Sequence, residues 1–145
     1  MLPCVKRMLA IDYGDVRMGL AVNDALGLTA QGVCSFKRTS LKNDLETIRE
    51  VMTAHHVEEI VIGMPYTLRG EKGAKAKDVD AFIEVLREHF ALPVVPWDER
   101  YTTVQAEEIL DSSGVNRKKK KSVVDMLAAT FILESYMESL RVHKE

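Results

Sequence analysis

Met8-Leu9-Ala10-Ile11-Asp12-Tyr13-Gly14 decides the fold, because it places an acid at the end of an uninterrupted apolar run. A strand that is apolar on both faces is typical of the centre of a sheet, so residues 8–13 predict a central strand. Asp is disfavoured inside strands, and beside a glycine it can be a simple turn residue. The residues alone leave Asp12 equally open to a turn role and to a role in a site.

The segments that follow this strand predict a mixed sheet covered by helices. Gly14-Asp15 predicts a hairpin into a second strand at about 18–22, and a third strand at about 28–36 completes an antiparallel meander. Two later strands, 60–64 and 94–97, alternate with helices, which is typical of parallel pairing and helices on both faces. The predicted helices are one capped by Ser40, one that carries Val79, Phe82, Leu86 and Phe90 on one side, one from Thr102 through Leu110, and a last one from about Ser122 to Leu140.

Length and composition favour one globular α/β domain over residues 1–145. The chain has 145 residues and is 46% hydrophobic, enough for a substantial core. No apolar run approaches the roughly 20 residues that span a bilayer, and the first residues lack the apolar core of a secretory signal. We therefore expect a cytoplasmic protein. Cys4 and Cys34 match no zinc pattern and are expected to be reduced thiols.

The charge balance gives little support to general nucleic-acid binding. The net charge is -2 and the pI is near 6.1, whereas a basic nucleic-acid-binding domain has a pI above about 9. Local patches would have to bind nucleic acid, and the candidate is the run Arg117-Lys118-Lys119-Lys120-Lys121. An isolated lysine run favours a solvated loop.

Glu99 is the second acid in a position of interest. It follows the strand 94–97, and ligand sites in open α/β sheets lie at the carboxyl ends of strands. The alternative is a surface ion pair with Arg100. Because side chains alternate along a strand, Asp98 and Glu99 face opposite sides, and the residues alone do not choose between them.

Asp125 is the third acid, and it also has two interpretations. Ser122-Val123-Val124-Asp125 has the spacing of a capping box, in which the acid only satisfies backbone N–H groups. Asp125 is also in register with the apolar residues Ala129 and Ile132, which places it on the side of the helix that faces the sheet. Capping and metal binding stay equally open from this helix alone.

Considered together, the three acids favour a shared site. Carboxylates are rarely buried without a positive partner, and Asp12, Glu99 and Asp125 come from distant segments that could meet at one edge of the sheet. Ligands that are all oxygen suit Mg²⁺ or Mn²⁺, and two such ions about 4 Å apart can hold a scissile phosphate. The expected chemistry is hydrolysis of phosphodiester bonds.

Five segments in this order resemble the YqgF/RuvX family, known as pre-16S rRNA nucleases and Holliday junction resolvases. The matching segments are Leu9-Ala10-Ile11-Asp12-Tyr13-Gly14, Arg17-Met18-Gly19-Leu20-Ala21 with Asp24, Val61-Ile62-Gly63-Met64-Pro65, Asp98-Glu99-Arg100-Tyr101-Thr102-Thr103, and Asp125-Met126-Leu127-Ala128-Ala129. The resemblance implies an RNase H-like fold with a five-stranded sheet. It also implies a divalent-metal nuclease site.

Carried over motif by motif, the resemblance makes Asp12, Glu99 and Asp125 the catalytic and metal-binding acids. Arg100, Thr102 and Thr103 would organise that corner or contact phosphate. The run of Lys118, Lys119, Lys120 and Lys121 would border the site and bind several phosphates, giving salt-dependent affinity. The loop after Pro65, Tyr66-Thr67-Leu68-Arg69-Gly70, departs from the family pattern.

The resemblance favours an endonuclease that matures the 5′ end of a pre-16S rRNA, with Mg²⁺ or Mn²⁺ as cofactor. The alternatives are a resolvase of four-way DNA junctions, a nucleic-acid-binding module without catalysis and an actin-type ATPase; the last needs two duplicated domains around its nucleotide. Trp97 and Tyr66 could stack on unpaired bases, although packing is the commoner role for such aromatics. The sequence leaves a monomer and a homodimer both open.

Overall fold

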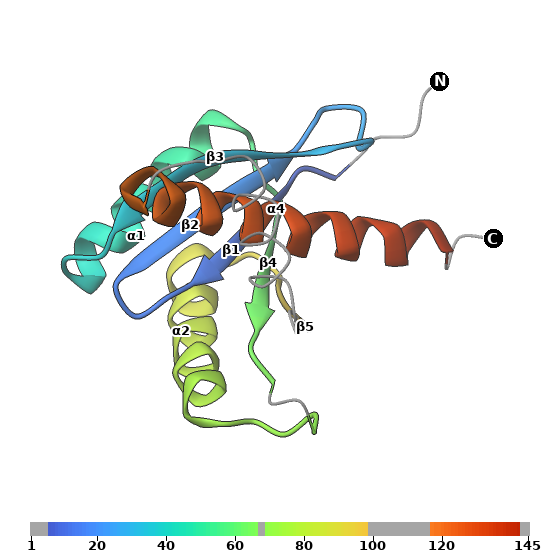
Figure 1. The fold of residues 1–145 in the computed structure, drawn as a ribbon. Helices are drawn as coiled ribbons and strands as arrows, with labels where there is room; N and C mark the ends of the chain where they lie inside the picture. Colours follow the sequence, from blue (N-terminus) through green and yellow to red (C-terminus); the bar gives the residue numbers. More distant parts are fainter. Residues whose placement is uncertain (1–5, 67–68, 99–116, 143–145) are drawn as a thin grey trace.

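The computed structural model describes residues 6–66, 69–98 and 117–142. Figure 1 shows three strands followed by alternating helices and strands, as predicted. The predicted helix that ends at Leu110 lies outside these ranges. The elements are β1 (Met8–Tyr13), β2 (Arg17–Asn23), β3 (Ala30–Lys37), α1 (Leu41–Ala54), β4 (Glu59–Met64), α2 (Ala74–Phe90), β5 (Val94–Asp98) and α4 (Arg117–Val142).

The five strands form one mixed sheet in the order β3-β2-β1-β4-β5. β1 pairs antiparallel with β2 and parallel with β4; β2 pairs antiparallel with β3, and β4 pairs parallel with β5. The predicted fold class, an α/β protein with an antiparallel meander joined to parallel strands, is confirmed. β1 is central, and its residues Met8 to Ile11 are all buried.

Helices cover both faces of the sheet, also as predicted (Figure 1). α4 lies across one face, and α1 and α2 lie on the other. Alternation along the central strand divides its side chains between the two layers. Leu9 and Ile11 belong to the cluster with α1 and α2, whereas Met8 and Ala10 belong to the cluster with Ala129, Ile132 and Leu133 of α4.

The helices on the first face form where the sequence periodicity predicts them. The Ser40 hydroxyl accepts a hydrogen bond from the Asn43 N–H at 3.1 Å and so caps α1. In α2 the apolar side is buried against the sheet, and the helix ends where Ala91 adopts a left-handed conformation. The buried residues of the two helices include Leu45, Ile48, Met52, Val79, Phe82 and Leu86.

The first residues of two elements differ from the sequence prediction by two positions or more. β3 begins at Ala30 and not at Leu28, because the Asp24 carboxylate accepts the N–H groups of Leu28 and Thr29 and so prolongs the turn. α4 begins at Arg117 and not near Ser122. Lys and Arg are good helix formers, and no Gly or Pro interrupts residues 117–122. The lysine run is therefore helical and is not the solvated loop that its composition favoured.

Within the described ranges, no helix combines the length and the hydropathy that a membrane span requires.

Candidate active site

The site is built on the carboxyl end of β1, where Asp12 faces α4. Met8 and Ala10, which precede Asp12 at intervals of two, both pack under α4, so Asp12 lies on the same face by strand alternation. Asp12 is half-buried. β1, β4 and β5 are parallel, so their carboxyl ends meet at one edge of the sheet, the position at which α/β proteins bind ligands.

Gly19 brings Asp125 next to Asp12. Gly19 of β2 is the direct partner of Asp12 across the antiparallel ladder. A Cβ atom on Gly19 would overlap the backbone carbonyl of Asp125 and would lie 3.0 Å from its Cβ. The backbone of α4 therefore rests on the glycine at the position of Asp125. Since neighbouring strands are about 4.8 Å apart, the two acids occupy adjacent positions on the face that α4 covers.

The Asp125 carboxylate is held by two side chains of the meander. The Arg17 Nε donates to Asp125 Oδ2 at 3.1 Å, and the Ser35 hydroxyl donates to the same oxygen at 3.0 Å. The Arg17 Nη2 also donates to Ser35 Oγ at 3.1 Å. The pair is mostly shielded from solvent, with 30% of the Arg17 side chain and 21% of the Asp125 side chain exposed.

A β-bulge in β3 supplies Ser35 to this cluster. The ladder between β2 and β3 shifts register between Leu20 and Ala21, so that Leu20 pairs with Cys34 and Ala21 pairs with Gly32. The extra residue is Val33. It packs, together with Cys34, against the hydrophobic cluster under α1 and α2, on the face opposite to α4. Gly32 and Ser35, which are three residues apart, consequently both face α4.

The capping interpretation of Asp125 is wrong. Ser122 and Asp125 both lie inside α4, which begins at Arg117. Asp125 is instead paired with an arginine, which satisfies the requirement that a shielded acid has a partner.

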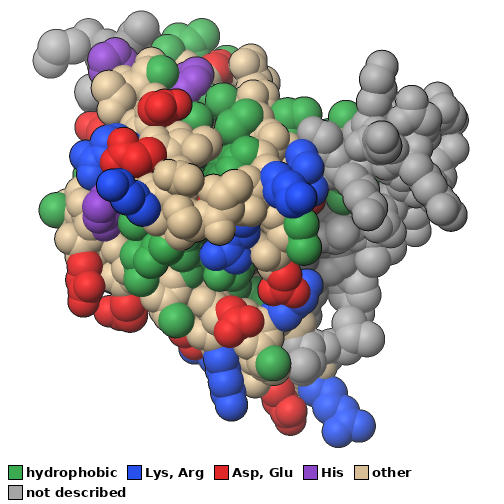
Figure 2. Space-filling model, turned by 90° about the vertical axis from the view of Figure 1, so that its left-hand side faces the viewer, with side chains coloured by type: hydrophobic (Ala, Val, Ile, Leu, Met, Phe, Trp, Pro, Cys, Tyr) green, Lys and Arg blue, Asp and Glu red, His purple; other side chains and the backbone are tan. Residues whose placement is uncertain are grey.

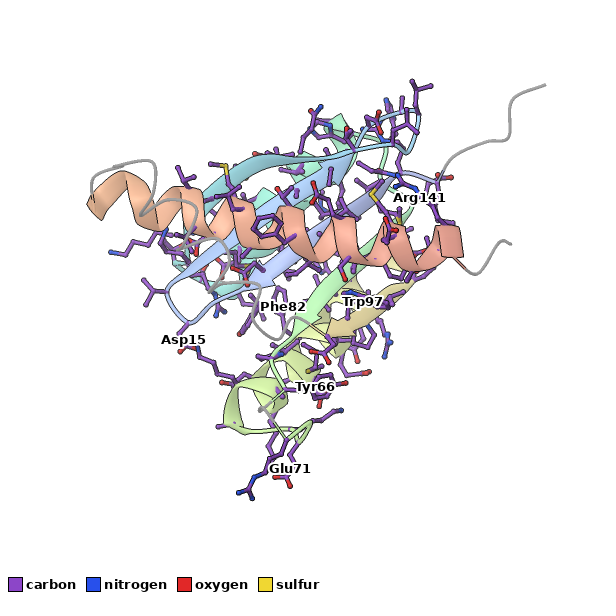
Figure 3. The ribbon with its side chains drawn as sticks, turned by 45° about the vertical axis from the view of Figure 1, so that its right-hand side comes forward. Asp15, Tyr66, Glu71, Phe82, Trp97 and Arg141 are labelled. Carbon is purple, nitrogen blue, oxygen red and sulfur yellow. The ribbon has the colours of Figure 1, made fainter. Side chains whose placement is uncertain are left out.

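The aromatic residues at the β5 edge pack against protein side chains. The Trp97 Nε1 donates to Ser135 Oγ at 2.9 Å, and the indole meets the Tyr136 ring edge-on with centroids 5.2 Å apart. Figure 3 shows Trp97 on β5, near the C-terminal half of α4. Tyr66 packs against the cluster under α1 and α2. Packing, the commoner of the two roles considered for these residues, is the one observed.

The Tyr136 hydroxyl connects this edge to a buried acid. It donates to Glu59 Oε1 at 2.6 Å, and the Lys6 ammonium reaches Glu59 Oε2 at 3.1 Å. Burial, followed by the hydrogen bond to Glu59, raises the pKa of Tyr136 to about 12. This arrangement anchors α4 to the amino end of β4, far along the helix from Asp125.

Several predicted site residues lie outside the described ranges. They are Glu99, Arg100, Thr102 and Thr103, which follow β5. Lys118 to Lys121 form part of the first turns of α4, and Lys121 precedes Asp125 by four residues, about one helical turn. The backbone thus carries the basic run to the same end of α4 as Asp125.

The donor chemistry at Asp12 and Asp125 fits a hard divalent cation. Both donors are carboxylates, and Mg²⁺ is commonly held by only one or two carboxylates together with water and substrate phosphates. Within the described ranges, no group of three or more His, Cys, Asp or Glu side chains could hold a metal ion. The expected third acid, Glu99, lies outside those ranges.

The face of the molecule that lies on the left-hand side of Figure 1 carries charges of both signs. Figure 2 shows basic and acidic side chains interspersed with hydrophobic ones on that face of the described residues, and no single-sign patch dominates it. Interspersed charges favour solubility over binding to a polyanion. This distribution agrees with the nearly balanced composition.

The roles of Arg17, Gly19 and Ser35 were missed from the sequence. Arg17 and Gly19 stand two apart on a predicted strand, so alternation could have placed them on one face. Ser35 was not accessible to such reasoning, because its orientation depends on the bulge at Val33.

Comparison with known proteins agrees with this geometry. Residues 6–139 match the family described as "RuvX: Holliday junction resolvase". The chain is 46% identical over 131 residues, 90% of its own length and 95% of the relative, to a protein of Carboxydothermus hydrogenoformans named "Putative pre-16S rRNA nuclease". It is 44% identical over 138 residues, 95% of its length and 92% of the relative, to a protein of the same name from Syntrophus aciditrophicus.

Two solved structures share the fold at low sequence identity. One is RuvC of T. thermophilus in complex with a Holliday junction substrate, with a TM-score of 0.55, 16% identity, and coverage of 94% of this chain and 96% of that one. The other is the Fowlpox virus resolvase with its substrate Holliday junction DNA, with a TM-score of 0.56, 17% identity, and coverage of 92% and 98%. The fold is thus RNase H-like, as predicted, and the match over residues 6–139 shows that the chain belongs to the RuvX family.

Proposed function

We propose that the chain is a divalent-metal-dependent endonuclease that hydrolyses phosphodiester bonds in structured nucleic acid, and that it acts as one nuclease domain. The observation that carries this proposal is the adjacency of Asp12 and Asp125 across Gly19, at the carboxyl edge of the sheet. Carboxylates that lie side by side at the carboxyl edge of a sheet can act together as oxygen ligands of one cation. Such a pair is suited to bind a hard cation beside a phosphate.

Asp12 and Asp125 would hold the cation, and Glu99, at the end of the parallel strand β5, is proposed as the third ligand. When bound, Mg²⁺ or Mn²⁺ neutralises phosphate charge and lowers the pKa of a water molecule for attack on phosphorus. The protein positions the cation and shields it under α4. Arg100, Thr102, Thr103 and the lysines of the run Lys118–Lys121 are proposed to contact the phosphate backbone.

Pre-16S rRNA is the first proposed substrate, with cleavage at its 5′ end. The relatives at 44% and 46% identity carry that substrate in their name, and they align over nearly the full chain. A second proposal is the four-way DNA junction, which is favoured by the description of the matching family. We expect the protein to act in the cytoplasm.

The test incubates the purified protein with labelled precursor RNA and with labelled four-way junctions, in Mg²⁺, in Mn²⁺ and in EDTA. We expect metal-dependent cleavage that falls at least about 100-fold in Asp12→Asn and in Asp125→Asn, because each removes a carboxylate ligand. The matched control is Asp15→Asn, an acid three residues from Asp12 but 66% exposed at the tip of the β1–β2 hairpin, which Figure 3 labels.

The outcomes separate the hypotheses. Cleavage of RNA that needs both acids but not Asp15 supports the proposal. If the protein cleaves only four-way junctions, the RNA substrate is rejected and the resolvase alternative is supported. Binding without cleavage by wild type, or unchanged cleavage by the Asp12 and Asp125 variants, overturns the active site and favours the non-catalytic module.

A further inference from the structure

The Arg17–Asp125 ion pair places a fixed positive charge inside the proposed metal site. Building on the proposed function, we propose that Arg17 is a built-in counter-ion of the site. It holds Asp125 by one oxygen, offsets the charge of this carboxylate when metal is absent, and repels a metal ion that binds beside it. The metal affinity of the site is therefore set partly by Arg17.

The geometry fixes which carboxylate oxygen Arg17 uses. Both hydrogen bonds that described residues make to the Asp125 carboxylate, from Arg17 Nε and from Ser35 Oγ, converge on Oδ2. The positive charge of the guanidinium is therefore held against one oxygen of the carboxylate. Arg17 itself is anchored by a second bond, from its Nη2 to Ser35 Oγ at 3.1 Å, so its planar guanidinium contacts the two partners from two different nitrogens.

The electrostatics follow from the same distances. Asp12 and Asp125 carry like charges on one face, and the guanidinium lies 3.1 Å from Asp125 Oδ2. A unit charge at such a distance interacts strongly in a shielded pocket, and burial reduces the screening that weakens exposed pairs. A divalent cation that binds Asp125 must approach this positive charge. Removing the charge should strengthen metal binding while it weakens the metal-free fold.

The second ion pair of this type in the described residues provides a matched control. Arg38 Nε reaches Asp44 Oδ2 at 3.2 Å, and both side chains are shielded, with 21% and 3% exposed. Arg38 stacks over the Tyr13 ring, which packs with the cluster under α1 and α2, on the opposite face from Asp125. Arg17→Met and Arg38→Met thus each remove one half-buried arginine from an aspartate, but only the first touches the proposed metal site.

The experiment measures Mn²⁺ binding by isothermal titration calorimetry and the melting temperature with and without Mn²⁺, so activity is not needed as a readout. Arg17→Met should bind Mn²⁺ roughly tenfold more tightly than wild type. It should melt lower without metal, but its metal-induced rise in melting temperature should be about 6 °C larger than that of wild type. Arg38→Met should also melt lower, with Mn²⁺ affinity within about twofold of wild type.

Wild type should bind Mn²⁺, and Asp12→Asn should abolish that binding. If Arg17→Met then binds Mn²⁺ no more tightly than wild type, the counter-ion role is overturned and the proposed function is left intact. Absence of Mn²⁺ binding in wild type overturns both. If Arg17→Met does not fold, Arg17→Gln and Arg38→Gln take its place, because glutamine keeps an amide donor while it removes the charge. The same tenfold difference is expected between them, and its absence refutes the inference.

Discussion

Gly19→Ala tests the close approach of α4 to the sheet, on which the adjacency of the two acids depends. The backbone conformation of Gly19 does not oppose the substitution, because only Gly27 and Gly70 among the described glycines have a positive φ. The obstacle is steric. The new methyl group would overlap the Asp125 carbonyl and lie 3.0 Å from the Asp125 Cβ, whereas ordinary contact begins at 3.4 Å.

The helix backbone cannot rotate away as a flexible side chain could. The new Cβ would lie 2.0 Å from the Asp125 carbonyl oxygen, so α4 has to move outward by about 1.4 Å to reach the 3.4 Å of ordinary contact. Overpacking of this kind costs about 2 kcal/mol. For a chain of this length that cost lowers the melting temperature by about 8 °C. The same movement separates Asp125 from Asp12, and a misplacement of about 1 Å can reduce catalysis roughly 100-fold.

Gly32→Ala is the matched control, because its new methyl group meets the same helix one residue further on. There the nearest atoms belong to the Met126 side chain, with Cβ at 3.1 Å and Cγ and Sδ at 3.6 Å. The Met126 Cβ is fixed to the helix backbone, but it has to move by only about 0.3 Å to reach ordinary contact. We therefore expect a change of less than about 1 kcal/mol and normal cleavage.

Thermal melting and the RNA cleavage assay, run on both glycine variants, decide the matter. If Gly19→Ala melts and cleaves like wild type, or like Gly32→Ala, then the contact between Gly19 and Asp125 does not set the position of α4. The reasoning that places the two acids side by side would then be refuted.

Two further predictions concern stability. Because burial and the Glu59 hydrogen bond raise the pKa of Tyr136 from 10.0 to about 12, the folded state favours the neutral phenol; this stabilisation is complete below pH 10 and is lost as the pH rises toward 12. In Tyr136→Phe the free energy of unfolding should therefore fall less between pH 9 and pH 11 than in wild type, as measured by urea denaturation. A fall as large as in wild type would contradict this role of Tyr136. Ser40→Ala should lower the free energy of unfolding by about 1 kcal/mol, because it removes the cap of α1, and should leave cleavage unchanged. An unchanged denaturation midpoint would show that the cap contributes nothing.

The sequence by itself determined the layers of this protein and its chemical candidates. The apolar run 8–11 required a central strand, and the alternation of strands and helices after residue 40 required parallel pairing with helices on both faces; both were predicted and confirmed. These features are local, since periodicity and turn residues within a dozen positions specify them. The acidic candidates were also visible, because a carboxylate at the end of an apolar strand is conspicuous against its neighbours.

Only the tertiary structure decided how the candidates are held. The start of α4 at Arg117 showed that Asp125 lies inside the helix and excluded the cap. The partners Arg17 and Ser35 lie 108 and 90 residues from Asp125 in the chain, and no local pattern connects them. Ser35 faces α4 only because a bulge shifts the ladder by one residue, which reverses the face of every later side chain in that strand. Long-range register and close backbone contact are properties of the packed sheet, and single-chain periodicity does not encode them.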